Sequence, residues 1–186
     1  MQQTLVETLA KASKELMLKE PFYGLLLMGL NKVWDKNLIV NNHPTAGVTL
    51  KGINYELRIH PEFWENLVAL HRIGILKHEL LHIGFFHLTD YGKYEHQDIL
   101  NMAMDIEINQ YIDRSWLPEH GCFLENFPEL KMEEKKGTRY YYEKLLAAAQ
   151  SGSQPVNMVL QAMANSEGES CTVELPNGQT VQIPNH

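Results

Sequence analysis

An HExxH motif, His78-Glu79-Leu80-Leu81-His82, is the part of this sequence best suited to carry chemistry. On a helix, residues four apart differ by about 40° in direction, so both imidazoles would project from one face, one turn apart. A tetrahedral zinc ion binds two such nitrogens at about 2.0–2.1 Å. Glu79 would lie on the same side, where it could accept a proton from a zinc-bound water and pass it to a leaving amine. The motif therefore predicts Zn2+ bound by His78 and His82, with Glu79 as the catalytic residue.

Two observations argue against an accidental motif. Composition alone gives roughly 0.04 expected HExxH matches in a chain of this length. The surrounding residues, including Ile73, Leu76 and Ile83, form an apolar helical segment, in which buried polar side chains need partners. A metal ion would be such a partner. An HExxH sequence on a purely structural helix is the alternative.

Asp105 is the leading candidate for the third protein ligand that zinc catalysis needs beside an open fourth position. Asn101, Asp105 and Asn109 recur every four residues and form one polar stripe on an otherwise apolar helix. An aspartate among Met, Ala and Ile is costly to bury unless it is paired. A second helix crossing the HExxH helix would bring this carboxylate to the metal. The alternatives are an aspartate that caps or pairs at a helix surface, and Glu107 as a weaker candidate ligand.

His87 is the other candidate for the third ligand. It lies five residues after His82, about 140° round a continuous helix and therefore on another face. It could bind the metal only if the helix broke near Gly84. The spacing also departs from the metzincin pattern, in which the glycine and the third histidine each come one residue later. We therefore expect His87 to be packed, or to contact a ligand rather than the metal.

Other residues could support the same chemistry, although each has a commoner structural explanation. His71 lies two helical turns before His78 and could be a polar cap at the helix mouth. His96 and His120, in expected loops, could stabilise an oxyanion, as could a phenol of the run Tyr140-Tyr141-Tyr142. The commoner outcomes are solvated loop histidines, and tyrosines that pack on one side of a helix and are exposed on the other.

The hydrophobic pattern predicts a mainly helical chain with a few short strands. Helices are expected over residues 4–18, 22–34, 63–88, 98–111, 138–149 and 156–164. Strands over 46–50 and 54–60 should form a hairpin directly before the HExxH helix, and a second hairpin should close around Pro176-Asn177-Gly178. The first hairpin could offer an edge strand to an extended peptide substrate, or it could be purely structural.

Composition and charge limit the class of protein. The 186 residues are 44% hydrophobic and 21% charged, which fits an ordinary globular domain with at most a small appendage. The net charge of −7 disfavours nucleic acids and anionic membranes as partners. The two cysteines form no CxxC pair, and the sequence has neither a signal-peptide pattern nor an apolar run long enough to cross a bilayer. We therefore expect a cytoplasmic protein.

Several motifs accompany HExxH in a familiar order: Thr45-Ala46-Gly47-Val48, Ile59-His60-Pro61-Glu62-Phe63, the segment 101–109 and Tyr142-Glu143-Lys144-Leu145. Together they resemble the metallopeptidase domain of bacterial and phage proteins that often precedes a von Willebrand factor A-like domain. The resemblance covers about residues 21–146. It implies a zincin-like α+β fold with a small mixed sheet beside the HExxH helix and an aspartate ligand on a second helix, in agreement with Asp105. This chain shows no von Willebrand A-like domain, so we expect a compact family member or a piece of a longer protein.

The sequence thus predicts a zinc metallopeptidase domain over residues 1–150, followed by a linker and a hairpin appendage over 151–186. Its partner would be a peptide or protein substrate, with no nucleic acid or membrane involved, and a protein partner of unknown identity could also bind. The alternative is a non-catalytic binding module, in which the metal holds two helices together within a phage or ATPase-associated assembly. An open coordination position would favour catalysis, whereas four protein ligands would favour the structural role.

Overall fold

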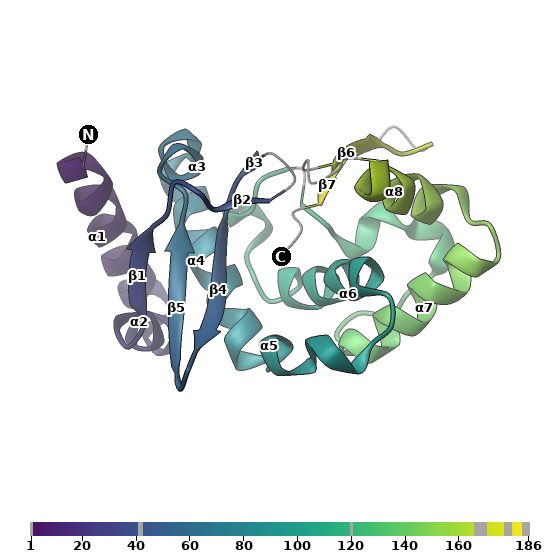
Figure 1. The fold of residues 1–186 in the computed structure, drawn as a ribbon, viewed down its shortest axis with the longest axis horizontal. Helices are drawn as coiled ribbons and strands as arrows, with labels where there is room; N and C mark the ends of the chain where they lie inside the picture. The colour runs from purple at the N-terminus through teal and green to yellow at the C-terminus, as the bar shows by residue number, and fades with distance from the viewer. Residues whose placement is uncertain (1, 41–42, 120, 166–170, 177–179, 184–186) are drawn as a thin grey trace. The chain divides into compact units, whose positions relative to one another are not determined.

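The computed structural model describes residues 2–40, 43–119, 121–165, 171–176 and 180–183 (Figure 1). The chain divides into two compact units. The first unit comprises Met1–Ile39, Pro44–Leu88 and Ile112–Pro118, and the second comprises Val40–His43, Thr89–Tyr111 and Glu119–His186. The predicted boundary near residue 150 stays a prediction, because this division concerns packing rather than independent folding.

The described residues are mainly helical and include a small mixed sheet, so the predicted α+β class is confirmed. The α-helices are α1 (Gln2–Lys19), α2 (Pro21–Met28), α3 (Pro61–Asn66), α4 (Ala69–Gly84), α5 (His87–Asp90), α6 (Gln97–Asn109), α7 (Thr138–Gln150) and α8 (Gln154–Asn165). The strands are β1 (Asn31–Trp34), β2 (Ile39–Val40), β3 (His43–Pro44), β4 (Ala46–Lys51), β5 (Asn54–Ile59), β6 (Cys171–Glu174) and β7 (Thr180–Ile183). Short 3-10 turns are η1 (Tyr91–Lys93), η2 (Arg114–Trp116), η3 (Leu124–Asn126) and η4 (Pro128–Leu130). Within the described part of the chain, no helix is both long and apolar enough for a membrane crossing.

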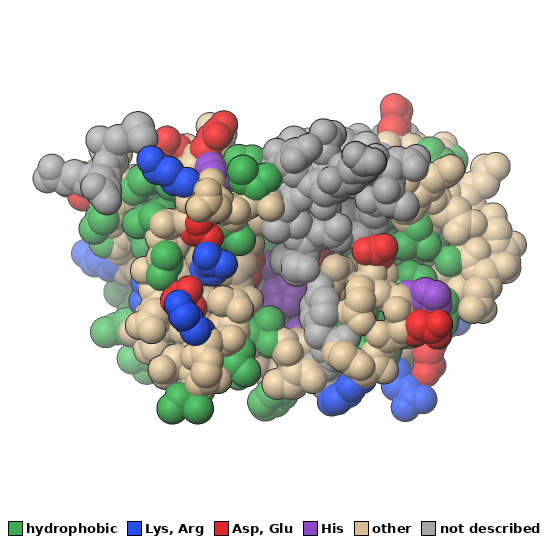
Figure 2. Space-filling view, viewed as in Figure 1, with side chains coloured by type: hydrophobic (Ala, Val, Ile, Leu, Met, Phe, Trp, Pro, Cys, Tyr) green, Lys and Arg blue, Asp and Glu red, His purple; other side chains and the backbone are tan. Residues whose placement is uncertain are grey.

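The sheet of the first unit has the strand order β1-β5-β4, with β1 parallel and β4 antiparallel to β5. Side chains alternate between its faces, so Leu57 and Ile59 of β5 are buried toward the helices. On the other face Arg58 bonds to Asp35 at 2.6 Å, and Figure 2 shows acidic and basic side chains mixed there. Helix α4 packs against β4 and against α1, behind the sheet as Figure 1 is drawn. The alternation of apolar and polar side chains along the strands thus gives the sheet the apolar face against which α4 packs.

The long helix predicted over residues 63–88 is divided into three. Helix α3 ends where Leu67 adopts an extended backbone (φ −74°, ψ 136°), and α4 begins at Ala69. Helix α4 then ends at Gly84, and Phe86 adopts a left-handed conformation with φ 61°. Apolar residues of all three segments, such as Trp64, Leu80 and Leu88, pack in one core, so the hydrophobic pattern alone does not reveal the breaks. The HExxH motif itself lies within α4, as predicted.

The helix predicted over residues 22–34 is too long. Helix α2 ends at Met28, and residues 31–34 form β1 instead. Trp34 packs edge-on against the buried Trp64, with ring centroids 6.1 Å apart. Parallel pairing with β5 and this ring contact favour a strand over the helix, which is tertiary structure overriding local preference.

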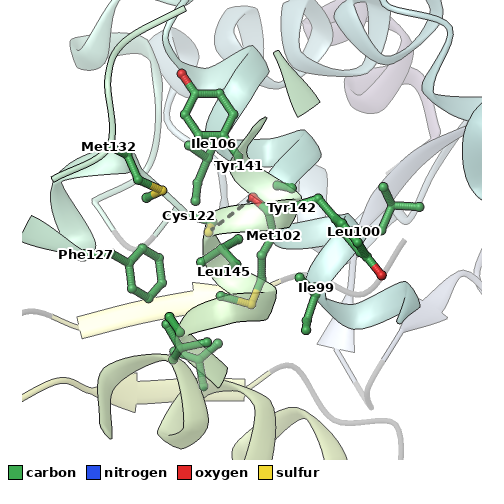
Figure 3. Close-up of a cluster of buried hydrophobic side chains, with 14 of the residues drawn as sticks. Ile99, Leu100, Met102, Ile106, Cys122, Phe127, Met132, Tyr141, Tyr142 and Leu145 are labelled. Carbon is green, nitrogen blue, oxygen red and sulfur yellow. Dashed lines mark hydrogen bonds between the residues drawn. The ribbon is translucent and has the colours of Figure 1, made fainter. Parts of the chain in front are cut away.

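The second unit has its own apolar core, built on α6, α7 and α8 (Figure 3). Ile99, Met102 and Ile106 of α6 pack with Tyr141 and Leu145 of α7 in this core. Strands β6 and β7 pair antiparallel, with Cys171 opposite Ile183. The turn expected at Asn177-Gly178 lies outside the described residues, so the C-terminal hairpin stays a prediction.

Candidate metal centre

Helix α4 brings His78 and His82 together on one side. Its apolar residues Leu76 and Leu80 are fully buried in the core of the first unit, which orients the helix. His78 and His82 are also buried, and their Nε2 atoms lie 3.1 Å apart. The local cause is the i, i+4 spacing, which places the second imidazole one turn above the first.

The distance between the two Nε2 atoms suits a shared metal ion. Two nitrogens at about 2.05 Å from a tetrahedral zinc ion would lie about 3.3 Å apart. The observed 3.1 Å is close to that value and is reached by His78 and His82 within one helix. The pair can therefore supply two adjacent ligands without rearrangement of α4.

Glu79 directly follows His78 on α4 and is buried, with 3% of its surface exposed. Its Oε2 atom has no hydrogen-bond partner among the described residues. Since a buried polar atom without a partner is costly, such an oxygen is typical of a functional site. Two convergent imidazoles, with a buried acceptor oxygen on the adjacent residue, fit a centre that holds a metal ion and a water or substrate. The residues present therefore fit the predicted ion.

His87 approaches the same pair from beyond the end of α4. The helix does break at Gly84, and the left-handed Phe86 turns the chain back toward it. His87 is 2% exposed, and its Nδ1 lies 2.9 Å from Nδ1 of His82. His87 thus contacts the nitrogen of His82 that faces away from His78, rather than the convergent Nε2 atoms.

Asp105 lies in the second unit, in the middle of α6, and is 1% exposed. Asn101 and Asn109 of the predicted polar stripe are buried as well, and Asn109 donates a hydrogen bond to the Cys122 carbonyl at 2.8 Å. This burial does not fit an aspartate that caps or pairs at a helix surface. Burial, followed by the negative charges of Asp105 and Glu125, raises the pKa of Cys122 well above its ordinary value.

Glu107, the weaker candidate ligand, joins two helices of the second unit. Its carboxylate accepts a hydrogen bond from the Thr138 hydroxyl at the start of α7. A carboxylate at a helix N-terminus is favoured by the partial positive charge of the unpaired N–H groups there. This contact explains the position of Glu107 by a structural role, without a metal ion.

The remaining histidine candidates lie in different settings. His71 is half-buried within α4, and His96 is exposed directly before α6, with no capping hydrogen bond from its side chain. His120 lies outside the described residues. Neither position supports a role for His71 or His96 in the chemistry.

The tyrosine run supports the scaffold of the second unit. Tyr141 and Tyr142 are buried, and Tyr140 is half-buried. The Tyr141 hydroxyl donates to the Glu133 carbonyl at 2.9 Å, and the Tyr142 hydroxyl accepts from the His96 backbone N–H at 3.3 Å. These contacts explain the tyrosines as packing residues of α7.

Sequence reasoning missed two residues that position α4. Lys77 is buried and bonds to Glu20 at 2.7 Å, with its ammonium 5.0 Å from the centre of the Tyr23 ring. A Cβ added at Gly74 would overlap the Trp116 carbonyl, lying 2.7 Å from its carbon, so only glycine allows η2 to approach the helix so closely. The available signals were a lysine and a glycine inside an apolar helical run.

Together, the α+β fold and the paired imidazoles define a class of protein with an HExxH helix suited to metal binding. The chain matches the family described as "Putative metallopeptidase domain" over residues 4–175 and therefore belongs to it. The match extends beyond the range 21–146 over which the motifs indicated the resemblance. No curated protein and no solved structure matches the chain significantly. Family membership and the geometry of α4 support a metal-dependent function.

Proposed function

We propose that this protein is a zinc-dependent metallopeptidase with a zincin-like site, acting on a peptide or protein substrate. The observation that carries the proposal is the convergence of His78 and His82 at 3.1 Å, together with a buried Oε2 on the adjacent Glu79 that has no hydrogen-bond partner among the described residues. Membership of the metallopeptidase family supports the same conclusion. The buried free thiol of Cys122 fits the reducing, cytoplasmic location that we also propose.

In this proposal Asp105 supplies the third ligand. Its carboxylate, on α6 of the second unit, would join the imidazoles of His78 and His82, as the polar stripe of that helix predicts. Two imidazoles and one carboxylate, with a fourth position left open, are a known ligand set of catalytic zinc. The burial of Asp105 supports its assignment, because an ionised carboxylate in such a place needs a cation or hydrogen-bond donors.

Glu79 is the general base in this mechanism. A bound divalent ion would polarise the scissile carbonyl and acidify an attacking water. Glu79 takes one proton from that water as its oxygen forms a bond to the carbonyl carbon. The same carboxyl then gives the proton to the leaving nitrogen as the C–N bond breaks, so one acid and one amine result. The unpartnered Oε2 supports this role, since an acceptor already committed to a protein donor would be a poorer base.

Strand β4 is the proposed binding edge for an extended substrate. It is an outer strand of its sheet, and α4 packs against it. The backbone N–H of His60 donates to the Thr45 carbonyl, which makes these residues a hydrogen-bonded pair. Because such pairs alternate along antiparallel strands, the N–H and C=O groups of Ala46, Val48 and Leu50 point away from β5. They could therefore pair with a substrate strand.

Metal analysis combined with Glu79→Gln tests the proposal. Protein purified without added metal should contain close to one zinc ion per chain. Glu79→Gln should keep that zinc and lose about a hundredfold or more of the peptidase activity, since general-base catalysis contributes on this scale. Unchanged hydrolysis by the variant would assign the base elsewhere.

Chelation distinguishes catalysis from the binding-module alternative. A catalytic ion should be removable with loss of activity while circular dichroism still reports a folded chain. If the ion is structural and holds helices together, its removal should unfold the chain. Unfolding on chelation would therefore favour the non-catalytic module.

A further inference from the structure

We propose that His87 is a positioning residue for His82, a role that rests on the metal-binding function proposed above. The two side chains meet through their Nδ1 atoms at 2.9 Å, with ring centroids 5.0 Å apart. Both side chains are buried, so water does not compete freely for this contact. His82 is thus contacted at both ring nitrogens: Nε2 by His78 and Nδ1 by His87.

The contact couples the tautomer of His82 to that of His87, because one of the two Nδ1 atoms must donate and the other must accept. A neutral imidazole carries its proton on one nitrogen and can bind a metal only through the other. When Nδ1–H of His82 donates to the lone pair of His87 Nδ1, Nε2 of His82 is left bare on the side of His78. The reverse arrangement, with His87 as donor, would place the proton of His82 on Nε2 and block it. Metal binding at Nε2 therefore requires His87 to act as the acceptor.

The local backbone explains how His87 reaches this position. On a continuous helix His87 would lie about 140° away from His82. The end of α4 at Gly84 and the left-handed Phe86 reverse the chain, so that His87, the first residue of α5, returns to the ligand. A non-glycine residue with positive φ is uncommon. Its place between His82 and His87 is consistent with a turn that serves this contact.

The same geometry separates the positioning role from metal ligation. His87 Nδ1 faces the Nδ1 side of His82, whereas the shared ion would lie at the Nε2 side. A histidine that contacts the far nitrogen of a metal ligand fixes its ring and tautomer, and loss of such a partner typically weakens metal binding ten- to hundredfold.

Zinc affinity of matched variants tests the proposal. The dissociation constant is measured by competition with a chromogenic chelator for wild type, His87→Leu, His87→Asn and the control His71→Leu. His87→Leu removes the acceptor and should bind zinc about ten- to hundredfold more weakly. His87→Asn keeps an oxygen acceptor near the position of Nδ1 and should stay within about threefold of wild type. His71 lies seven residues before His78, about 10 Å along α4, and its replacement should leave the affinity unchanged.

Each outcome bears on one proposal or on both. A wild-type chain that binds no zinc would overturn the metal-binding function together with the role of His87. Equal affinity of wild type and a folded His87→Leu variant would overturn only the role of His87. If His87→Leu does not fold, 15N NMR of zinc-loaded wild type decides: a bare Nδ1 on His87 that accepts from His82 supports the proposal, and a proton on Nδ1 of His87 overturns it.

Discussion

His82 Nδ1 and His87 Nδ1 lie 2.9 Å apart, although the end of α4 and a left-handed residue separate them along the chain. The two nitrogens meet because α4 ends at Gly84, whereas its apolar pattern predicts a helix that continues to residue 88. The end of a helix thus determines the surroundings of a candidate metal ligand. The position of His87 therefore depends on where α4 ends as well as on the HExxH motif.

Replacing Asp105 should weaken metal binding. Asp105→Asn removes the charge of the proposed third ligand while keeping its size, so the zinc dissociation constant should rise by at least about a hundredfold. Glu107→Gln, on the same helix, removes a charge that the structure places at the start of α7, and should leave the constant within about threefold of wild type. Competition with a chelator measures both. A stronger effect of Glu107→Gln than of Asp105→Asn would reverse the assignment of the ligand.

Replacing Val48 with proline should impair substrate binding without unfolding the chain. The N–H that is lost points away from β5, and edge strands tolerate proline at such positions. KM for an extended peptide should rise by about tenfold, roughly the effect of one lost backbone hydrogen bond. Thr49→Pro is the matched control, since its N–H pairs with β5, and it should lower the melting temperature. An unchanged KM in Val48→Pro would argue against β4 as the substrate edge.

Adding a methyl group at Gly74 should destabilise the first unit. Alanine is a better helix former than glycine by about 1 kcal/mol, but its Cβ would overlap the Trp116 carbonyl. Such overpacking typically costs about 1–3 kcal/mol, which outweighs the gain. Gly84→Ala meets no atom within 4 Å and should be neutral or stabilising. Urea unfolding of both variants compares the two sites. Equal free energies of unfolding for Gly74→Ala and Gly84→Ala would show that η2 can shift away from the added methyl group without loss of stability.

The thiol of Cys122 should make stability depend on pH in the alkaline range. Burial, together with Asp105 and Glu125, raises its pKa above the value in the unfolded chain, so folding favours the protonated form. Its contribution is therefore complete below the unfolded pKa of about 8.5 and is lost as the pH rises above it, by up to about 1.4 kcal/mol per pH unit. Wild type should lose stability relative to Cys122→Ala between pH 8 and pH 10. Parallel stability curves for the two proteins would show that Cys122 does not titrate differently on folding.

The sequence by itself determined the HExxH helix, the facing of His78 and His82, and the polar stripe that contains Asp105. These features depend on spacing along one helix, and 3.6 residues per turn fixes that geometry within each helix. The tertiary structure decided where the helices end, that residues 31–34 pair with β5, and which nitrogen of His82 meets His87. It also revealed the close approach of Trp116 to Gly74. Helix ends, strand pairing and such contacts depend on residues distant in the chain, which compete with local preference through burial and hydrogen bonding, so no local pattern could have predicted them.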